Sequence, residues 1–356
     1  MGERVLVAMS GGVDSSMAAA LLVERGFEAV GVGMQLWDHS EGEGRFDSCC
    51  SPRDMADARA VADRLGIPFY VLNLREEFRR WVVDYFVAEY ARGRTPNPCV
   101  ACNQHLKFDF LLRKALALGA DRVATGHYTR LTRHWPSGYL SLARSADRSK
   151  DQTYFLFGLS QGQLRRALFP VGELSKEEVR ARARGLGLPT ADKPESQEIC
   201  FIPDGEYRKF LRRETPMSFR EGPLLDEEGR VLGTHGGVGD FTVGQRRGLG
   251  IGGKEPLHVL RLDGEKNAVI VGPRERLRRV EFRVERVRWS IPGPREPLRA
   301  SVQVRHRQRP RDATLYPEEG GWLRARLDEP DGAVSPGQAA VLFEGDILLG
   351  GGWVAS

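Results

Sequence analysis

The sequence lacks any run of 18 or more apolar residues, and its first residues lack the pattern of a signal peptide. These two absences predict a cytoplasmic protein that has no membrane partner. Cysteine is scarce, with five in 356 residues. A small, odd number of cysteines without secretory features disfavours a disulfide framework and favours thiol or metal chemistry.

Two common nucleotide and metal motifs are also missing. The glycine-rich segment Ser10–Ser16 (SGGVDSS), which follows the apolar run Val5–Met9, lacks the lysine of a P-loop. The pair Cys99 and Cys102 lacks the second CxxC that a closed zinc site needs. The sequence therefore predicts neither a P-loop nucleotidase nor a structural zinc domain.

What is present at Ser10–Ser16 is a strand-to-helix turn. Gly11 and Gly12 allow a sharp turn and a close approach of backbone to a ligand. The helix that begins near Ser15 offers unpaired amides and its positive dipole end to an anion. The segment resembles the SGGxDS signature of the ATP-pyrophosphatase, or PP-loop, class, whose members cleave ATP between the α and β phosphates to form an adenylate. ATP is therefore the expected ligand, with Mg²⁺ beside it and Asp14 as the candidate ligand of the ion.

The first two hundred residues alternate between strand-like and helix-like segments. This βαβ rhythm predicts an α/β fold with a parallel sheet and helices on both faces. Ligands of such sheets bind beyond the carboxyl ends of the strands, where Ser10, Met34 and Gly126 stand, so these residues should converge. The expected strands are Val5–Met9, Glu28–Met34, Phe69–Leu74 and Arg122–Thr125, and the expected helices are Pro52–Leu65, Val82–Arg92 and Lys107–Leu118.

The length of the chain exceeds what one core usually supports, so two or three domains are expected. After about Phe210, glycine-rich turns separate short strand-like runs, and further runs of strand length lie between Phe282 and Phe343. This pattern predicts a small β-rich domain followed by a β-barrel or sandwich. The expected domains are residues 1–208, which bind ATP, the central linking residues 209–275, and a carboxyl-terminal β-barrel over residues 276–356.

Arginine is concentrated in the second half of the chain, and this clustering is more informative than the net charge of the whole protein. Thirteen arginines stand between Arg274 and Arg311 against four glutamates, and a second basic cluster spans Arg208–Arg213. Guanidinium groups suit phosphate geometry, which favours a nucleic-acid partner. The alternation of Arg and Glu around Arg283–Arg288 fits a solvated charged face equally well, so both interpretations stay open.

Cys99 and Cys102 lie in the segment Thr95–Asn103, a loop that two prolines are expected to hold open before the helix at Lys107. A thiol near a helix amino terminus is more readily deprotonated, and the thiolate is both a nucleophile and a metal ligand. The pair therefore marks a candidate chemical site.

The other three cysteines are less distinctive on their own. Cys200 lies about a hundred residues further on, and an isolated cysteine is often a small buried hydrophobic residue. Cys49 and Cys50 are adjacent and are expected to be loop residues, with a redox or sulfur-relay role as the alternative.

Segments along nearly the whole chain resemble the tRNA-specific 2-thiouridylase family. The matching segments are AMSGGVDSS, GRTPNPCVACNQHLKF, ATGHYTR, KDQTYFLF, LFPVGELSK, SQEICFIPDG, GQRRGLGIGG and SPGQAAVLFEGDILLGGG. The resemblance implies a parallel-sheet domain like that of adenine nucleotide alpha hydrolases. It implies a tRNA-uridine 2-sulfurtransferase that adenylates the C2 oxygen of uridine 34, the wobble base, and replaces this oxygen with sulfur, giving 2-thiouridine, AMP and pyrophosphate. Implied partners are tRNAs of the Lys, Glu and Gln type and a sulfur donor or relay protein.

The resemblance also implies roles for individual residues. Those implied to bind ATP are Ala8, Met9, Ser10, Gly11, Gly12, Val13, Asp14, Ser15, Met34 and Gly126. Those implied to contact tRNA are Asn97, Pro98, Cys99, His127, Lys150, Asp151, Gln152, Arg305, His306 and Gln338. Outside the motifs, an ordinary structural role would be the better interpretation of several of these, for example a turn for His127, a solvated charge for Lys150 and a loop for Gln338.

For sulfur transfer, the resemblance implies that Cys200 carries a persulfide sulfur and that Cys102 attacks it, releasing sulfide or forming a disulfide. The chain departs from the family at Cys99, where many members have aspartate. Members with three cysteines are implied to hold a [4Fe-4S] cluster through Cys99, Cys102 and Cys200, with the fourth iron open to sulfide. We predict this cluster-dependent route, with the persulfide and disulfide route as its alternative.

Two other classes of function remain compatible with parts of the sequence. A different PP-loop enzyme, such as an amidotransferase-type or tRNA lysidine synthetase, would share the ATP loop but would not need Cys102 and Cys200. A noncatalytic RNA-binding protein would need only the arginine-rich second half of the chain.

Overall fold

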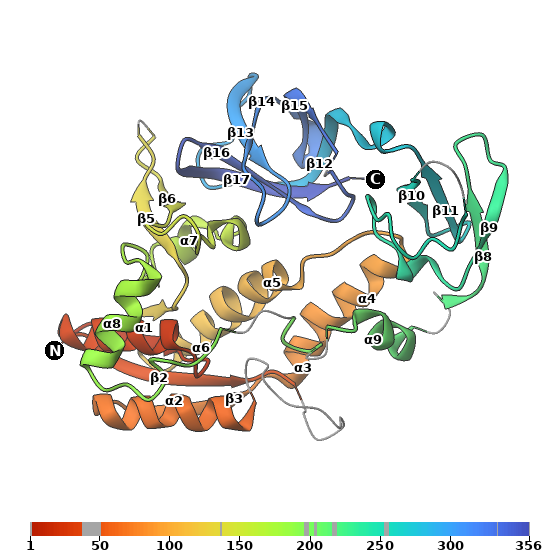
Figure 1. The fold of residues 1–356 in the computed structure, drawn as a ribbon. Coiled ribbons are helices and arrows are strands. Elements are labelled where there is room, and N and C mark those ends of the chain that lie inside the picture. Colours follow the sequence, from red (N-terminus) through yellow and green to blue (C-terminus); the bar gives the residue numbers. More distant parts are fainter. Residues whose placement is uncertain are drawn as a thin grey trace. The chain divides into compact units, whose positions relative to one another are not determined.

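In the computed structural model, the described residues are 2–37, 51–135, 137–195, 199–202, 205–215, 219–252, 256–332 and 334–355. Contacts divide the chain into two compact units (Figure 1). Unit 1 comprises Met1–Val82, Cys99–Gly205 and Asp346–Leu348, and unit 2 comprises Val83–Pro98, Glu206–Gly345 and Leu349–Ser356.

Unit 1 is built on a five-stranded sheet in the order β3-β2-β1-β4-β7, and every pairing in it is parallel. The pairing confirms the predicted parallel sheet. Its strands are β1 (Arg4–Ala8), β2 (Glu28–Gln35), β3 (Phe69–Asn73), β4 (Arg122–Ala124) and β7 (Ala167–Leu168).

Apolar side chains cover both faces of the central strand. Val5, Val7 and Met9 are buried in one core together with α1, α2 and α8. Leu6, which alternation points to the opposite face, is buried as well. A strand covered on both faces needs a continuous apolar run, which is why Val5–Met9 has no polar residue.

The remaining elements of unit 1 are helices and one hairpin. The helical segments are α1 (Val13–Glu24), α2 (Pro52–Leu65), α3 (Arg75–Phe78), η2 (Arg79–Val83, which ends at the unit boundary), α5 (Pro98–Ala101, which begins there), η3 (Cys102–Phe110), α6 (Leu111–Ala117), η4 (Thr153–Leu156), α7 (Gln161–Leu164) and α8 (Lys176–Gly185). The hairpin strands β5 (Thr129–Arg133) and β6 (Leu140–Arg144) were not predicted, and Ile347 pairs with Ala143 of β6.

The helix that carries the paired cysteines begins earlier than expected. The sequence predicts a loop up to Lys107, but α5, η3 and α6 follow one another without a break from Pro98 to Ala117. Proline is well tolerated in the first turn of a helix, where its missing N–H has no intrahelical partner to lose. The expected open loop is therefore wrong, and Cys99 and Cys102 lie in the helix.

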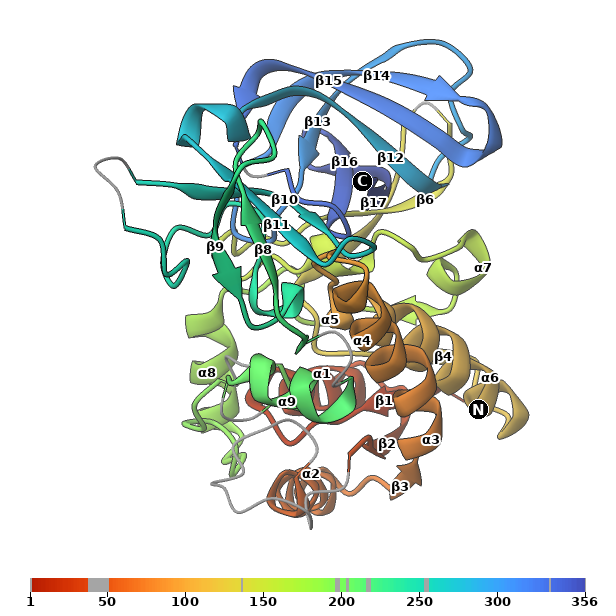
Figure 2. The ribbon, with the colours of Figure 1, turned by 90° about the vertical axis from the view of Figure 1, so that its right-hand side faces the viewer.

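Unit 2 contains a four-stranded sheet and a closed barrel (Figure 2). The sheet has the order β10-β11-β8-β9, in which β11 and β8 run parallel and the other pairs antiparallel. Its elements, with the helices of this unit, are α4 (Asp84–Ala91), α9 (Tyr207–Glu214), β8 (Gly222–Leu225), β9 (Val231–His235), η6 (Val238–Asp240), β10 (His258–Asp263), β11 (Ala268–Gly272) and η7 (Arg274–Leu277).

The barrel confirms the second half of the predicted fold. Six strands follow the order β12-β15-β14-β13-β16-β17, and β12 also pairs with β17, which closes the barrel around a buried apolar core. The elements are β12 (Arg279–Trp289), β13 (Leu298–Gln303), β14 (Arg311–Glu318), η8 (Glu319–Gly321), β15 (Trp322–Asp331), β16 (Ala339–Glu344) and β17 (Ile347–Val354, whose first two residues belong to unit 1). The last strand was not predicted, because its three consecutive glycines Gly350–Gly352 are untypical of a strand interior. None of the helices in the described part of the chain is long and apolar enough to cross a bilayer.

Candidate nucleotide and thiol site

The glycine-rich loop connects β1 to α1 and leaves the start of α1 open. Gly12 is the N-cap residue and so offers no side-chain cap to the first amides. The hydroxyls of Ser15 and Ser16 donate to the Gly12 carbonyl at 3.0 and 2.9 Å, which fixes the turn from within. The first amides of α1 and its dipole are therefore suited to bind the anion that the sequence predicts.

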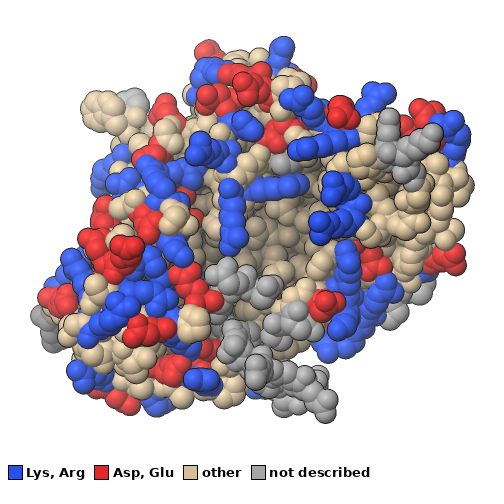
Figure 3. All heavy atoms as spheres, in the orientation of Figure 1, with Lys and Arg blue, Asp and Glu red and all other residues tan. Residues whose placement is uncertain are grey.

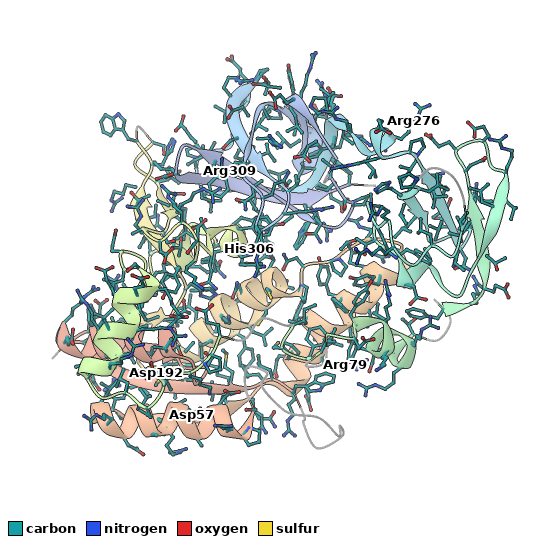
Figure 4. The ribbon with its side chains drawn as sticks, viewed as in Figure 1. Asp57, Arg79, Asp192, Arg276, His306 and Arg309 are labelled. Carbon is teal, nitrogen blue, oxygen red and sulfur yellow. The ribbon has the colours of Figure 1, made fainter. Side chains whose placement is uncertain are left out.

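Gly11 lets the loop pass close to the start of α2. Its φ is +74°, and a Cβ at this position would lie 2.2 Å from the carbonyl oxygen of Asp54. Asp54 is fixed by a capping box, in which the Asp54 amide donates to Ser51 Oγ at 3.2 Å and the Ser51 amide donates to Asp54 Oδ2 at 3.0 Å. Lys193 adds an ion pair to Asp54 at 2.6 Å and another to Asp57, which Figure 4 labels on α2.

Gly126, which follows β4, lies against the same loop. A Cβ at Gly126 would lie 2.5 Å from the amide nitrogen of Ser15 and 2.6 Å from the carbonyl carbon of Asp14. Met34 is the last residue but one of β2, which lies on the other side of β1, and its side chain is buried. The side chains of Ala8, Met9 and Val13 are buried too, so they hold the loop through packing.

Asp14 is held by two residues for which the sequence predicts no role. Lys176 Nζ lies 2.8 Å from both carboxylate oxygens, and the Tyr128 hydroxyl donates to Oδ1 at 2.8 Å. Burial, and after it the charge of Asp14, raises the pKa of Tyr128, so its hydroxyl stays a donor. Both residues lie in segments that carry the family resemblance, LFPVGELSK and ATGHYTR, but nothing in either segment points to Asp14.

Lys176 also links Asp14 to Lys150. Its Nζ lies 2.8 Å from Glu195 Oε1, and Lys150 Nζ lies 3.0 and 2.8 Å from the two oxygens of Glu195. Burial raises the pKa of Glu195, but hydrogen bonds from the two lysines outweigh it, and the pKa is lowered on balance. We call Tyr128, Asp14, Lys176, Glu195 and Lys150 the charge chain.

Asp14 fits a role as a single ligand of Mg²⁺. Mg²⁺ in nucleotide sites takes one or two carboxylates, the phosphates and several waters. The Asp14 carboxylate supplies one such ligand at the mouth of the loop, and it is partly exposed. Within the described ranges, no group of three or more His, Cys, Asp or Glu residues is placed to hold a metal ion without further ligands.

The two cysteines of the CxxC pair lie one helical turn apart. Cys99 is exposed in the first turn, and Cys102 is buried where the helix becomes π-helical. Both carry thiols, as does the half-buried Cys200. Rare π-helical turns are frequent at functional sites, which is consistent with chemistry at Cys102. Cys49 and Cys50 lie outside the described residues.

The three thiols of the predicted cluster do not form a metal-binding group. A cluster with three protein ligands needs Cys99, Cys102 and Cys200 to converge on one centre. Across the ranges that the structure describes, these residues are not gathered in any such group. The described residues therefore do not fit a preformed [4Fe-4S] site.

Two residues expected to face RNA in unit 1 are involved in internal contacts near Tyr128. His127 is buried, and its Nδ1 lies 2.7 Å from Thr125 Oγ1. Burial, and after it the charge of Lys107, holds the pKa of His127 well below its usual range, so the ring is neutral at pH 7. Gln152 Oε1 accepts a hydrogen bond from the Tyr128 amide at 3.0 Å.

The preceding residue, Asp151, is also occupied within unit 1. It is buried, pairs with Arg144 at 2.7 Å and accepts the Thr153 hydroxyl at 2.7 Å. Asp151 thus fixes the backbone that presents Lys150.

Five of the residues expected to face RNA lie in unit 2. Asn97 is half-buried and Pro98 is buried. Arg305 is exposed after β13, and its guanidinium lies 3.4 Å from Ser335 Oγ. His306, labelled in Figure 4 together with Arg309, is half-buried in the same turn. Gln338 donates to the carbonyl of Thr95 at 2.9 Å.

Many barrel arginines are neutralised by acidic neighbours. Pairs such as Arg283 with Glu318 and Arg299 with Asp328, each at 2.7 Å, lie on the strands. Figure 3 shows acidic and basic side chains interspersed over the barrel at the top of the view. A solvated charged face therefore accounts for part of the arginine excess.

The second basic cluster lines a cavity of unit 2. This cavity, of about 450 Å³, lies between α9 and the turns of the four-stranded sheet. Arg208, Lys209 and Arg212 contribute to its wall, with His235 and Asp240. Arg212 pairs with Asp240, so the wall is basic but partly compensated.

Three family models match the chain in succession. The model of the tRNA methyl transferase HUP domain matches residues 3–204. The model of the tRNA methyl transferase PRC-barrel domain matches residues 208–273, and that of the Aminomethyltransferase beta-barrel domain matches residues 279–354. The parallel sheet, the middle sheet and the six-stranded barrel correspond to these matches in order.

Curated relatives are similar over nearly the whole chain. A protein of Geotalea uraniireducens named tRNA-specific 2-thiouridylase MnmA is 49% identical over 99% of this chain and 95% of its own length. Proteins of the same name from Geobacter metallireducens and Chloroflexus aggregans are each 51% identical over 99% of this chain, and over 96% and 98% of their own lengths. A solved 4-thiouridine synthetase–RNA complex with bound ATP is far more distant, with a TM-score of 0.36 and 16% identity over 60% of this chain and 50% of that chain.

Replacing Gly126 by alanine should weaken ATP binding. The added Cβ would lie 2.5 Å from Ser15 N, and a backbone atom cannot rotate away as a flexible side chain can. We expect the affinity for ATP, measured by titration calorimetry, to fall by about tenfold or more, which corresponds to about 1.4 kcal/mol. Gly185→Ala in α8 is the matched control, because no atom lies within 4 Å of its added Cβ. Equal ATP affinities for the two variants would contradict a close approach of Gly126 to the nucleotide loop.

Replacing Lys176 by methionine should leave the Asp14 carboxylate uncompensated beside the phosphates. Without Mg²⁺ we expect ATP affinity to fall about tenfold or more, since a hydrogen bond to a charged group contributes about 1.5–3 kcal/mol. Added Mg²⁺ should restore part of the loss, because a divalent cation then neutralises Asp14. Lys176→Arg, which keeps the charge, is the control and should lose less. Tighter ATP binding by Lys176→Met without Mg²⁺ would show that Lys176 does not support the anion site.

Proposed function

This chain belongs to the tRNA-specific 2-thiouridylase family, and from that premise we propose that it adenylates the C2 oxygen of uridine 34 in tRNA and replaces that oxygen with sulfur. The products are 2-thiouridine, AMP and pyrophosphate. The observation that carries the proposal is the close match over the whole chain, with an anion site on α1 and two cysteines one turn apart in the same unit.

Adenylation is the step that makes the exchange of oxygen for sulfur possible. The C2 carbonyl of uracil is a poor electrophile, and its oxygen is a poor leaving group. Once the oxygen is bonded to the α phosphate, it departs as part of AMP. The enzyme therefore has to hold the α phosphate of ATP beside the base, and the amides at the start of α1 are suited to bind the phosphates.

The ATP site is proposed to follow the residues implied by the resemblance, from Ala8 to Ser15 with Met34 and Gly126. Asp14 would hold Mg²⁺ beside the phosphates, where the charge of the ion makes pyrophosphate a better leaving group. For Asp14 to bind the ion, Lys176 must give up at least one of its two contacts with the carboxylate.

The tRNA site is proposed to include the segment Asn97–Cys99 at the target base. His127, Lys150, Asp151 and Gln152 would contribute from unit 1, Asp151 by holding the backbone of Lys150. The barrel would contribute through Arg305 and His306. The resemblance implies Gln338 as well, whose side chain donates to the carbonyl of Thr95. The expected substrates are the wobble uridines of Lys-, Glu- and Gln-type tRNAs, and the expected partner is a sulfur donor or relay protein.

Sulfur transfer is proposed to use Cys200 and Cys102. A persulfide on Cys200 attacks C2 through its terminal sulfur, and the C2–O bond breaks, so that AMP leaves with the electron pair. The Cys102 thiolate then attacks Cys200 Sγ, and the electron pair of the persulfide S–S bond passes to the sulfur on C2. A disulfide between Cys102 and Cys200 results, and a thiol reductant must return it to two thiols.

The cluster-dependent route, which the sequence analysis predicts, becomes the alternative here. It would require Cys99, Cys102 and Cys200 to converge, and the described residues do not support this arrangement. No step is therefore derived through a cluster, and the two routes are distinguished by experiment.

Mass analysis of tRNA nucleosides tests the proposed reaction. In a single turnover with ATP, Mg²⁺ and a persulfide donor, the unmodified protein should yield 2-thiouridine, and Cys102→Ala should yield none while still binding ATP. Cys49→Ala, which replaces a cysteine without an assigned role, is the control and should remain active. If Cys102→Ala and Cys200→Ala both stay active, a different PP-loop enzyme is indicated. An absence of tRNA-stimulated pyrophosphate release would favour a noncatalytic RNA-binding protein.

Iron analysis of anaerobically purified protein distinguishes the two sulfur routes. In the persulfide route, iron-free protein and Cys99→Ala should both transfer one sulfur in a single turnover from a persulfide donor, because two thiols suffice. Loss of transfer in both, together with stoichiometric iron in the unmodified protein, would instead establish the cluster-dependent route.

A further inference from the structure

We propose that the carboxyl-terminal barrel positions the segment Arg94–Pro98, which leads directly into Cys99, and that Glu285 and Gln338 are the positioning residues. The inference rests on the proposed function, because this segment is where the target base is expected. It gives the barrel a part in catalysis in addition to any contact with RNA.

The first observation is that the segment belongs to the same compact unit as the barrel and not to the unit of the residues on either side of it in the chain. Residues Val83–Pro98 lie in sequence between two parts of unit 1, yet their contacts assign them to unit 2. The helix α4 and the residues after it are therefore grouped by their contacts with residues from Glu206 onward.

A half-buried ion-pair cluster ties Arg94 to the barrel. Arg94 lies 2.6 Å from Glu285 on β12 and 2.8 Å from Glu89 on α4. Arg94 and Glu89 are only 13% and 5% exposed in their side chains. Burial raises the pKa of Glu285, but hydrogen bonds and charge from Arg94, and then Arg286, lower it on balance. Breaking one partner of such a buried pair is costly because it leaves a charge unpaired.

Thr95 is held through its backbone on both sides. Its amide donates to the carbonyl of Pro336 at 2.9 Å, and its carbonyl accepts from Gln338 Nε2 at 2.9 Å. Gly337 between them has a φ of +86°, and a Cβ there would lie 2.9 Å from Thr95 N. The turn at residues 335–338 therefore approaches the segment so closely that only glycine fits.

The turn itself is fixed to the last strand of the barrel. The Gly337 amide donates to the Val354 carbonyl at 2.9 Å, and the Val354 amide donates to the Gln338 carbonyl at 2.8 Å. Trp353 on the same strand packs against Tyr85 of α4 with ring centroids 5.8 Å apart. The position of Thr95 is therefore set by the barrel framework and not by a loose loop.

Two prolines stiffen the segment between Thr95 and Cys99. Pro96 and Pro98 have fixed φ angles, and each also restricts the residue before it, so that Thr95 and Asn97 keep extended conformations. Cys99 lies four positions after Thr95, which is at most about 14 Å of chain. Fixing Thr95 thus limits where Asn97 can point.

The contact of Gln338 with Thr95 gives this residue a role different from the RNA contact that the family resemblance implies. A residue that touches tRNA should change the affinity for tRNA when it is replaced. A residue that positions the base-contacting segment should change the rate of the bound complex instead.

The test compares Gln338→Ala and Glu285→Gln with Asp328→Asn in the full-length protein. Asp328→Asn weakens an ion pair with Arg299 on the same barrel without touching the segment. We expect Gln338→Ala and Glu285→Gln to lower kcat for 2-thiouridine formation by about tenfold to a hundredfold, as misplaced reacting groups do. The Kd values for ATP and for tRNA should stay within about twofold of the unmodified protein. Asp328→Asn should match the unmodified protein.

Hydrogen exchange at the Thr95 amide supplies a readout that does not depend on activity. Both variants should exchange this amide faster than Asp328→Asn does, while thermal unfolding shows all three proteins folded. Unchanged exchange and unchanged kcat would overturn the proposal. Weaker tRNA binding by Gln338→Ala with unchanged exchange would also overturn it, and would identify Gln338 as an RNA contact. If the unmodified protein makes no 2-thiouridine, the proposed function fails, whereas the exchange rates still decide whether the barrel holds the segment.

Discussion

The parallel pairing of β1 with β2 on one side and β4 on the other is the constraint on which the nucleotide site depends. It places the carboxyl ends of three strands at one edge of the sheet. Only then can Gly126 lie against the amide of Ser15, and only then can Tyr128 reach Asp14. Because strand side chains alternate, a shift of one residue in this register would remove both contacts at once.

The charge chain shows how the loop keeps a carboxylate next to an anion site. Its charged members alternate in sign from Asp14 through Lys176 and Glu195 to Lys150. Each charge therefore has a partner before any ligand arrives, and none of them is buried alone. When a nucleotide binds, the members of the charge chain can exchange ion-pair partners. This exchange costs less free energy than the transfer of a new charge out of water.

The parts of the site that the sequence predicted are those that depend on local signals. The apolar run Val5–Met9 and the two glycines after it are enough to predict strand, turn and helix, and the structure has all three. Lys176 was not predicted as a partner of Asp14, because the two residues lie 162 positions apart and no local pattern connects them. The same holds for the barrel arginines, whose number is visible in the sequence while their carboxylate partners lie on other strands.

The start of the cysteine helix was missed for a different reason. Two prolines within four residues usually indicate a loop, and Pro96 does precede the helix. Pro98, however, occupies the first helical turn, where its fixed φ is already correct. The exposed Cys99 and the buried Cys102 consequently differ by one turn of a helix and not by the conformation of a loop.

The π-helical segment Cys102–Phe110 has a consequence for how this region can change over time. Its i→i+5 hydrogen bonds use one residue more per turn than the α-helix of Leu111–Ala117 that follows. Deleting a single residue while this hydrogen-bond pattern is kept would rotate the cysteines relative to the buried face of α6, by somewhat less than the 100° that one α-helical residue turns. Substitutions along the segment keep this orientation, whereas insertions and deletions do not. The number of residues between Cys102 and Leu111 is therefore constrained more tightly than their identities.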